Sequence, residues 1–193
     1  MIDLSLNEVE TLSTKAARGA GFSWGQAEEI GRAARRIAVE DGGWGFAMLS
    51  LVENAQSFQP PDLARAARWR NGEADVAAGR PLCPIRTAAL LLDDPPPAGV
   101  IPLTIFDVGL PIWLDAMLRR SKMRLAHPVG LRTSRADVVI ERSVDIWQPV
   151  AGRRGAVDQQ TLTALNSFAA RTYVPESERS RVRGAGGVRV DDE

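Results

Sequence analysis

The 193-residue sequence predicts an α+β fold with a helical N-terminal half and a β-rich centre. Apolar residues recur at helical spacing through about the first 57 residues. Prolines then punctuate short apolar runs, one of them rich in β-branched residues, before helical spacing returns. We therefore expect helices first, β structure over about 98–148, one packed C-terminal helix and a loose tail.

The first two helices are predicted over 5–19 and 24–40, and each begins with a capping box. The Ser5 hydroxyl can accept from the backbone NH three residues later, while the glutamate there reaches back to the cap. Ser23 repeats this pattern with a glutamine. Both segments carry an apolar stripe at helical spacing, so each is expected to pack one face on the core.

A third helix is predicted over 44–57, where the early turns are apolar nearly all round, as is typical of a buried helix. An alanine-rich stretch predicts a weaker helix over 62–78. The run 87–92 is short enough for a strand, although its leucines also fit a helix.

The rest of the chain alternates between short strands and helices. The predicted strands are 100–108, 123–126, 136–141 and 144–147, and the predicted helices are 110–120 and 158–172. Apolar content falls sharply near the C-terminus. We therefore predict a single domain over 1–174, followed by a flexible tail over 175–193.

Charge and cysteine content narrow the class of protein. The 24 basic residues balance the 24 acidic ones, so no net field draws the chain to nucleic acid or to an anionic membrane. Neither an apolar run of ~20 residues nor a signal-peptide pattern is present. Cys83 and His127 are the sole cysteine and histidine, which argues against a disulfide or a zinc site. We expect a cytoplasmic protein without metal, cofactor, membrane or nucleic-acid partner.

The corner between the first two helices is the first candidate site. Gly19 and Gly21 free the backbone just before a helix N-terminus, where NH groups and the helix dipole attract anions. Lys15 and Arg18 would add positive charge, and Trp24 follows closely. The spacing differs from the dinucleotide fingerprint, and a helix precedes it. The alternative is a tight helix–helix corner with a purely capping role.

The end of the last helix is the second candidate site. Arg171 and Tyr173 are suited to gripping a carboxylate or a phosphate, although a helix end followed by a frayed tail is the alternative. We predict that the chain ends meet and that these two residues join the corner in one anion site, since neither segment alone makes a pocket.

Other residues have structural alternatives. Trp44 lies among glycines, which suits either close approach of a ligand or a core position after a helix break. A thiolate–imidazole pair of Cys83 and His127 is conceivable, but their apolar and proline neighbours favour packing. Glu53 and Asp115 interrupt apolar helices and could act as bases, or pair with arginines. The basic cluster over 119–124 could touch phosphate or be a solvated helix end.

Two segments resemble a bacterial family known as a domain of unknown function. These are KAARGAG at 15–21 with WGQAEE at 24–29, and AARTYVP at 169–175. The resemblance implies a match over most of the chain but brings no activity with it, and the final residues 188–193 depart from the family's ending. It does fall on the same two segments as the candidate sites.

The sequence therefore favours a small-molecule protein, an enzyme or an enzyme's accessory subunit, that binds an anionic metabolite. The alternative is a non-catalytic or regulatory interaction protein whose tail docks on a partner and becomes ordered there. That partner would be another protein or a second copy of the chain.

Overall fold

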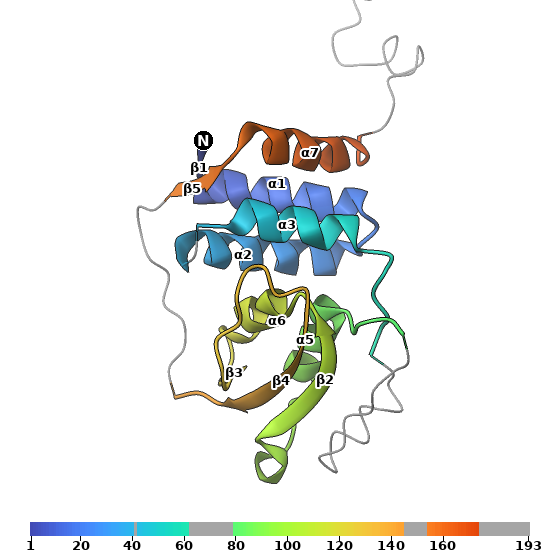
Figure 1. Ribbon diagram of the computed structural model, residues 1–193, viewed down its shortest axis with the longest axis vertical. Coiled ribbons are helices and arrows are strands. Elements are labelled where there is room, and N and C mark those ends of the chain that lie inside the picture. The colour runs from blue at the N-terminus through green and yellow to red at the C-terminus, as the bar shows by residue number, and fades with distance from the viewer. Residues whose placement is uncertain (41, 62–78, 145–153, 174–193) are drawn as a thin grey trace, which may run out of the picture.

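The computed structural model describes residues 1–40, 42–61, 79–144 and 154–173, which form two packed parts (Figure 1). The first part is a layer of helices: α1 (Leu6–Gly19), α2 (Trp24–Glu40), α3 (Trp44–Glu53) and α7 (Gln159–Ala170). A small antiparallel sheet of β1 (Ile2–Ser5) and β5 (Arg154–Val157) borders this layer. Helix α7 packs on α1 and α3, so the C-terminal helix closes the N-terminal layer.

The second part combines helices with a three-stranded antiparallel sheet. Its elements are α5 (Pro84–Asp93), the 3-10 helix η1 (Ala98–Val100), β2 (Leu103–Gly109), α6 (Pro111–Leu118), β3 (Met123–Leu125) and β4 (Arg135–Arg142). The strand order is β2-β4-β3. Helix α2 packs on both α5 and α6, and so joins the two parts. The α+β class, with helices concentrated in the N-terminal half, is confirmed.

The capping boxes position the first two helices as predicted. The Ser5 Oγ accepts from the Glu8 NH at 3.2 Å, and the Glu8 Oε2 accepts from the Ser5 NH at 2.7 Å. The same reciprocal pair joins Ser23 and Gln26, at 3.3 and 3.1 Å. Because both caps are complete, α1 and α2 begin where the sequence places them.

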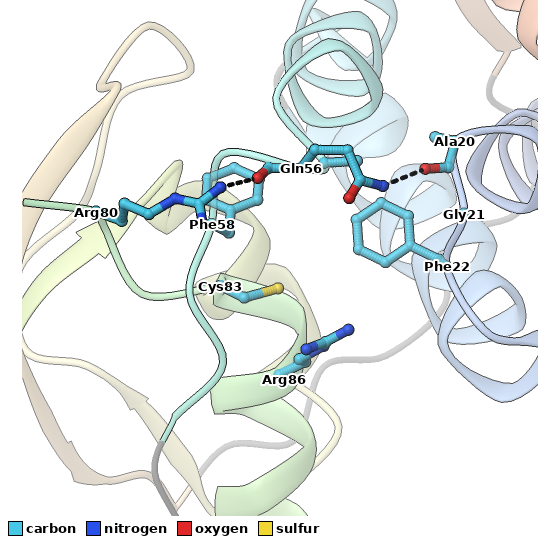
Figure 2. A pocket seen from close by; sticks show the side chains of 9 residues that line it. Ala20, Gly21, Phe22, Gln56, Phe58, Arg80, Cys83 and Arg86 are labelled. Atoms are coloured by element: carbon cyan, nitrogen blue, oxygen red, sulfur yellow. Dashed lines mark hydrogen bonds between the residues drawn. The ribbon is translucent and has the colours of Figure 1, made fainter.

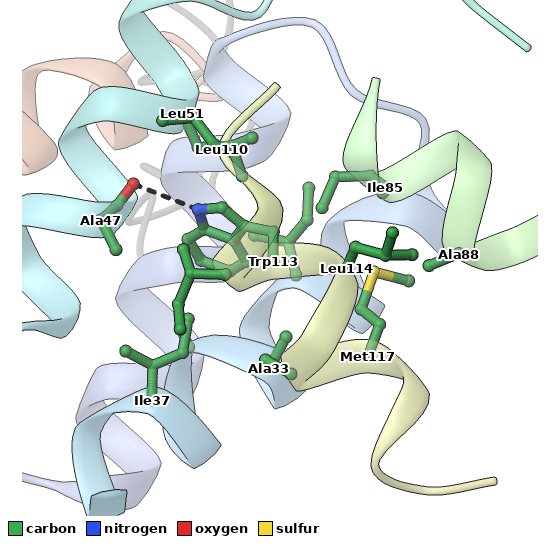
Figure 3. Close-up of a cluster of buried hydrophobic side chains, with 14 of the residues drawn as sticks. Ala33, Ile37, Ala47, Leu51, Ile85, Ala88, Leu110, Trp113, Leu114 and Met117 are labelled. Atoms are coloured by element: carbon green, nitrogen blue, oxygen red, sulfur yellow. Dashed lines mark hydrogen bonds between the residues drawn. The ribbon is translucent and has the colours of Figure 1, made fainter. Parts of the chain in front are cut away.

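One hydrophobic core contains residues from both parts of the molecule, and α6 packs within it against α2 and α5 (Figure 3). Every residue of α6 is buried. Trp113 is fully buried there, and its Nε1 donates to the Ala47 carbonyl on α3 at 3.3 Å. Ile37 of α2 and Leu51 of α3 lie around the indole in the same cluster. The apolar run that α6 carries is thus the link between the two parts.

Three sequence expectations differ from the structure. The strand alternative for 87–92 is wrong, because α5 occupies this stretch as a helix that starts at Pro84, where a proline fits the first turn. Helix α3 ends at Glu53, four residues before the predicted end at 57. The Asn54 side chain follows this end and donates to the Ser50 carbonyl at 2.9 Å. Strands β1 and β5 were not expected.

The predicted strands over 100–108, 123–126 and 136–141 are present as β2, β3 and β4, and the predicted helices over 110–120 and 158–172 as α6 and α7. The helix expected over 62–78, the strand over 144–147 (except its first residue) and the tail over 175–193 lie outside the described residues. Among the described helices, none combines the length and the apolar character that crossing a bilayer requires.

Candidate functional site

A pocket of about 300 Å³ opens beside the α1–α2 corner (Figure 2). We call it the corner pocket; it is lined by Ala20, Gly21, Phe22, Ala55, Gln56, Phe58, Arg80, Cys83 and Arg86. Three separate stretches of chain meet here: the corner itself, the segment after α3, and the segment that leads into α5. The pocket therefore exists only in the folded chain.

Gln56, in the segment after α3, forms hydrogen bonds with both of the other stretches. Its side-chain Nε2 donates to the Ala20 carbonyl at 3.4 Å, and its own backbone carbonyl accepts from the Arg80 guanidinium (Figure 2). Gly21 has a φ of +100°, and a Cβ there would lie 3.2 Å from the Gln56 Nε2. Glycine at this position thus supplies both the left-handed turn and the room beside Gln56.

The lining of the corner pocket is positively charged. Arg80 and Arg86 contribute guanidinium groups, and none of the described residues that line the pocket is acidic. Within the described chain, Arg86 makes no hydrogen bond or ion pair through its side chain, and Arg80 has no carboxylate partner. Two guanidinium groups without counter-charges in one small pocket make it suited to an anion.

Cys83 contributes a buried thiol at the start of α5. Burial raises the pKa of this thiol above its ordinary value, although the backbone NH groups of Arg86 and Ile85 act in the opposite direction. The protonated form is therefore favoured at neutral pH, and such thiols react slowly. His127 is exposed in the chain after β3 and does not line the pocket. The packing interpretation of Cys83 fits better than a thiolate–imidazole pair.

The two glycines of the corner face different neighbours. A Cβ on Gly19 would lie 1.8 Å from the Phe168 carbonyl oxygen and 3.4 Å from the Arg171 Cβ. Gly19 is therefore the point where the end of α1 touches the end of α7, and it lies outside the lining of the corner pocket. Gly21 lines that pocket instead. The corner thus separates the pocket from the C-terminal helix.

The remaining predicted site residues form cation–aromatic pairs near the ends of α1 and α7. The pairs, measured from the cation to the ring centre, are Lys15 with Tyr173 at 5.7 Å, Arg18 with Trp24 at 4.5 Å, and Arg171 with Phe168 at 4.2 Å. Arg18 also donates to the Phe22 carbonyl. None of the three cations forms an ion pair within the described chain. We call these six residues the cation–aromatic cluster.

A second cavity of about 490 Å³ runs between α1 and α7. We call it the α1–α7 groove; it is lined by Leu4, Asn7, Glu8, Thr11, Leu12, Lys15, Leu162, Asn166, Ala169 and Tyr173. Neither this groove nor the corner pocket is lined by both Arg18 and Arg171. The contact at Gly19 brings the two chain segments together, but one anion site shared by both segments stays a prediction.

Two of the other candidates have structural roles in the described chain. Trp44 is fully buried, and Gly155 packs so closely on it that a Cβ there would lie 2.7 Å from the indole Nε1. Glu53 is exposed at the end of α3. Asp115 binds Arg119, with 2.8 Å between the Oδ2 and Nη2 atoms. These observations favour the structural interpretation of Trp44 and Asp115, whereas Glu53 forms no ion pair within the described chain.

The arginines of the basic cluster over 119–124 pair with neighbouring acids. Arg120 pairs with Glu29 at 2.7 Å and Arg124 pairs with Glu141 at 2.7 Å, while Arg119 also reaches Glu40. Such pairing leaves little charge for a phosphate, so the solvated helix end is the better interpretation.

Sequence reasoning missed Gln56, Arg80 and Arg86. Gln56 follows α3, whereas Arg80 and Arg86 lie just before and within α5. Local sequence patterns do not show that these distant residues line one pocket. The one usable signal was Pro84, which starts a helix and places Arg86 in its first turn.

Comparison with known proteins gives one match. Residues 4–49 match the model of a family described as "Protein of unknown function (DUF3726)". The match covers β1 in part, α1, α2 and the start of α3, and it includes the α1–α2 corner. The resemblance of the opening segment to an uncharacterised family is therefore confirmed, whereas the segment over 169–175 lies outside the matched residues. No curated protein and no solved structure matches the chain significantly.

Proposed function

We propose that this protein binds a small anionic metabolite in the corner pocket, as an enzyme or as the accessory subunit of one. One observation carries the proposal: Arg80, just before α5, and Arg86, in its first turn, line a pocket that has no acidic residue in its described lining. A guanidinium group presents several NH donors in a planar fork, which matches the oxygens of carboxylates and phosphates.

Several arginines elsewhere on the described surface do have a carboxylate partner. Arg32, Arg35, Arg120 and Arg124 each pair with a glutamate within 3.5 Å. A chain with balanced charge can thus supply counter-ions to many of its arginines, and it supplies none in the described lining of this pocket. The missing negative charge is what a bound anion would contribute.

The size of the corner pocket limits the ligand. Its volume of about 300 Å³ is at the lower end of the range for small-molecule sites. Small residues, Ala20, Gly21 and Ala55, form part of the wall and leave backbone within reach of a ligand. A compact anion, such as a short carboxylate or a small phosphate ester, fits these limits.

The arginine test uses calorimetric titration with inorganic phosphate, succinate and phosphoglycolate. We expect at least one of these anions to bind, and Arg86→Gln or Arg80→Gln to weaken that binding by roughly 10- to 100-fold, the effect of losing a charged hydrogen bond. Arg86→Lys, which keeps the charge but not the fork, should recover part of the affinity.

Arg132→Gln is the matched control, because Arg132 is exposed beside Phe46 and does not line the pocket. It should bind the anions as the unaltered protein does. Equal affinity in the Arg86 and Arg132 variants would contradict the proposal, as would the absence of binding by any anion of this class.

Cys83→Ser should leave anion binding within about twofold and lower the free energy of unfolding by about 1 kcal/mol. The thiol is buried and protonated, so it supplies packing rather than charge. Cys83 makes no side-chain cap hydrogen bond, and a serine at this N-cap position would offer an acceptor to the first NH groups of α5, which limits the loss. Urea unfolding and phosphate titration of the same sample test both parts. A folded serine variant that no longer binds would mean that the thiol takes part in recognition.

A further inference from the structure

We propose that the α1–α7 groove docks an amphipathic, acidic segment of a partner polypeptide, with its carboxylates at the Lys15 end. This inference concerns a different surface from the corner pocket and does not depend on the anion proposed there. It is carried by three features: an apolar floor, a cluster of cations without carboxylate partners, and a direction along the groove.

The apolar residues that line the groove are less exposed than the polar ones, and we call them its floor. Leu4, Leu12 and Leu162 are half-buried and Ala169 is buried, whereas the asparagine and threonine residues of the lining are exposed. Its volume of about 490 Å³ is sufficient for several apolar side chains of an approaching segment. Apolar anchors surrounded by polar contacts are the usual arrangement where a helix binds a groove.

The Lys15 end of the groove carries the positive charge. Lys15 and Arg171 are exposed, and Arg18 lies one turn beyond Lys15 on α1. None of the three has a carboxylate partner within the described chain. Charge complementarity therefore calls for an acidic occupant at this end.

Exposed aromatic rings lie under two of these cations. Trp24 is 67% exposed beneath Arg18, and Tyr173 is 60% exposed beneath Lys15. Tryptophan, tyrosine and arginine are the residues that most often carry the binding energy of protein interfaces. The stacked rings also hold the long cationic side chains in place, which lowers the entropy lost on binding.

The groove has opposite charges at its two ends. Glu8 lines it in the first turn of α1, and Lys15 follows seven residues later, about 10 Å along the helix axis. The Glu8 carboxylate is held in place by the Ser5 NH at 2.7 Å. A docked segment would therefore direct its acidic residues toward Lys15 and away from Glu8.

A polypeptide from another protein fits these features better than a nucleic acid or a second copy of the chain does. The aliphatic floor has no counterpart on a nucleic acid, which offers bases and phosphates. A second copy that packed its own groove against this one would bring one lining carboxylate, that of Glu8, to the three cations Lys15, Arg18 and Arg171. Most of these cations would then have no carboxylate partner.

The test measures binding of fluorescent peptides to the full-length protein by anisotropy. Three synthetic peptides of about 14 residues share one leucine–alanine stripe and carry glutamate, serine or lysine at the other positions. We expect the glutamate peptide to bind roughly tenfold more tightly than the serine peptide, and the lysine peptide to bind least.

Variants then locate the binding. Lys15→Glu and Arg171→Glu should each weaken binding of the glutamate peptide by roughly tenfold or more, and Asn166→Trp should block the groove. Arg132→Glu is the matched control with unchanged affinity, since Arg132 lies outside both the groove and the cluster. Melting temperatures within a few degrees of the unaltered protein show that the variants are folded. Arg86→Gln should not alter peptide binding, nor Lys15→Glu anion binding, so the two proposals fail separately.

A photo-crosslinking residue in place of the exposed Thr11 identifies the occupant directly. Crosslinks to the glutamate peptide support the proposal. Crosslinks to residues 174–193 of the same chain, or to a second copy, would assign the groove to those occupants and overturn it. Tighter binding of a thymidine oligonucleotide that is lost in Lys15→Glu would also overturn it, as would equal binding of all three peptides.

Discussion

Gly19→Ala is expected to lower the free energy of unfolding by about 3 kcal/mol, a large loss for one added methyl group. The new Cβ would lie 1.8 Å from the Phe168 carbonyl oxygen and 2.7 Å from its carbon. Both atoms belong to the backbone of α7, so no side-chain rotation can relieve the overlap. The end of α7 must move away from α1, and the packing between the two helices is lost with it.

Gly25→Ala is the matched control. Gly25 lies in α2, and a Cβ there would meet no atom within 4 Å. Since alanine favours the helix over glycine, this variant should be unchanged or more stable by up to about 1 kcal/mol. Urea unfolding of both variants gives the comparison. A Gly19 variant as stable as the Gly25 variant would mean that α7 does not rest on the end of α1.

The same substitution connects stability with the proposed interaction surface. Arg171 and Tyr173 follow directly after the helix that Gly19 supports, and Tyr173 stacks with Lys15 across the groove. A shift of α7 would separate these pairs. Gly19→Ala should therefore also weaken binding of the glutamate peptide, whereas Gly25→Ala should not.

Local patterns predicted those elements whose signals lie close together in the sequence. Helices α1 and α2 begin at capping boxes made within four residues, at Ser5 and Ser23. Strands β1 and β5 have four residues each, and Ile2 pairs with Val157 across nearly the whole chain. A short strand whose partner is so distant carries no local signal, because its stability comes from the pairing itself.

The corner pocket shows the same limit for a functional site. The sequence pointed to Gly21, which does line the pocket, but not to Arg80 or Arg86. These arginines line the pocket because the residues just before α5 and in its first turn lie beside the corner, where Gln56 hydrogen-bonds to Ala20 and Arg80. Chemistry that depends on bringing such distant residues together is visible only once the fold is known.

Trp113→Ala is expected to lower the free energy of unfolding by about 3–5 kcal/mol, as for other large aromatic residues removed from a core. Trp113 is fully buried on α6, and it packs against α2 and α3 while its indole NH donates to the Ala47 carbonyl. Its removal leaves a cavity at the junction between the two parts of the molecule. The remaining contacts of α2 would then have to hold the two parts together.

Trp113→Phe separates the two contributions of this side chain. Phenylalanine keeps an aromatic ring but loses the hydrogen bond to Ala47 and part of the volume, so a smaller loss of about 1–2 kcal/mol is expected. Urea unfolding followed by fluorescence and by circular dichroism gives both values. A cooperative junction predicts that the two signals change together in each variant, because α6 ties the sheet to the helical layer. Two separate transitions in the unaltered protein would show instead that the parts unfold independently. An alanine variant whose free energy of unfolding falls by less than about 1 kcal/mol would show that Trp113 does not hold the parts together.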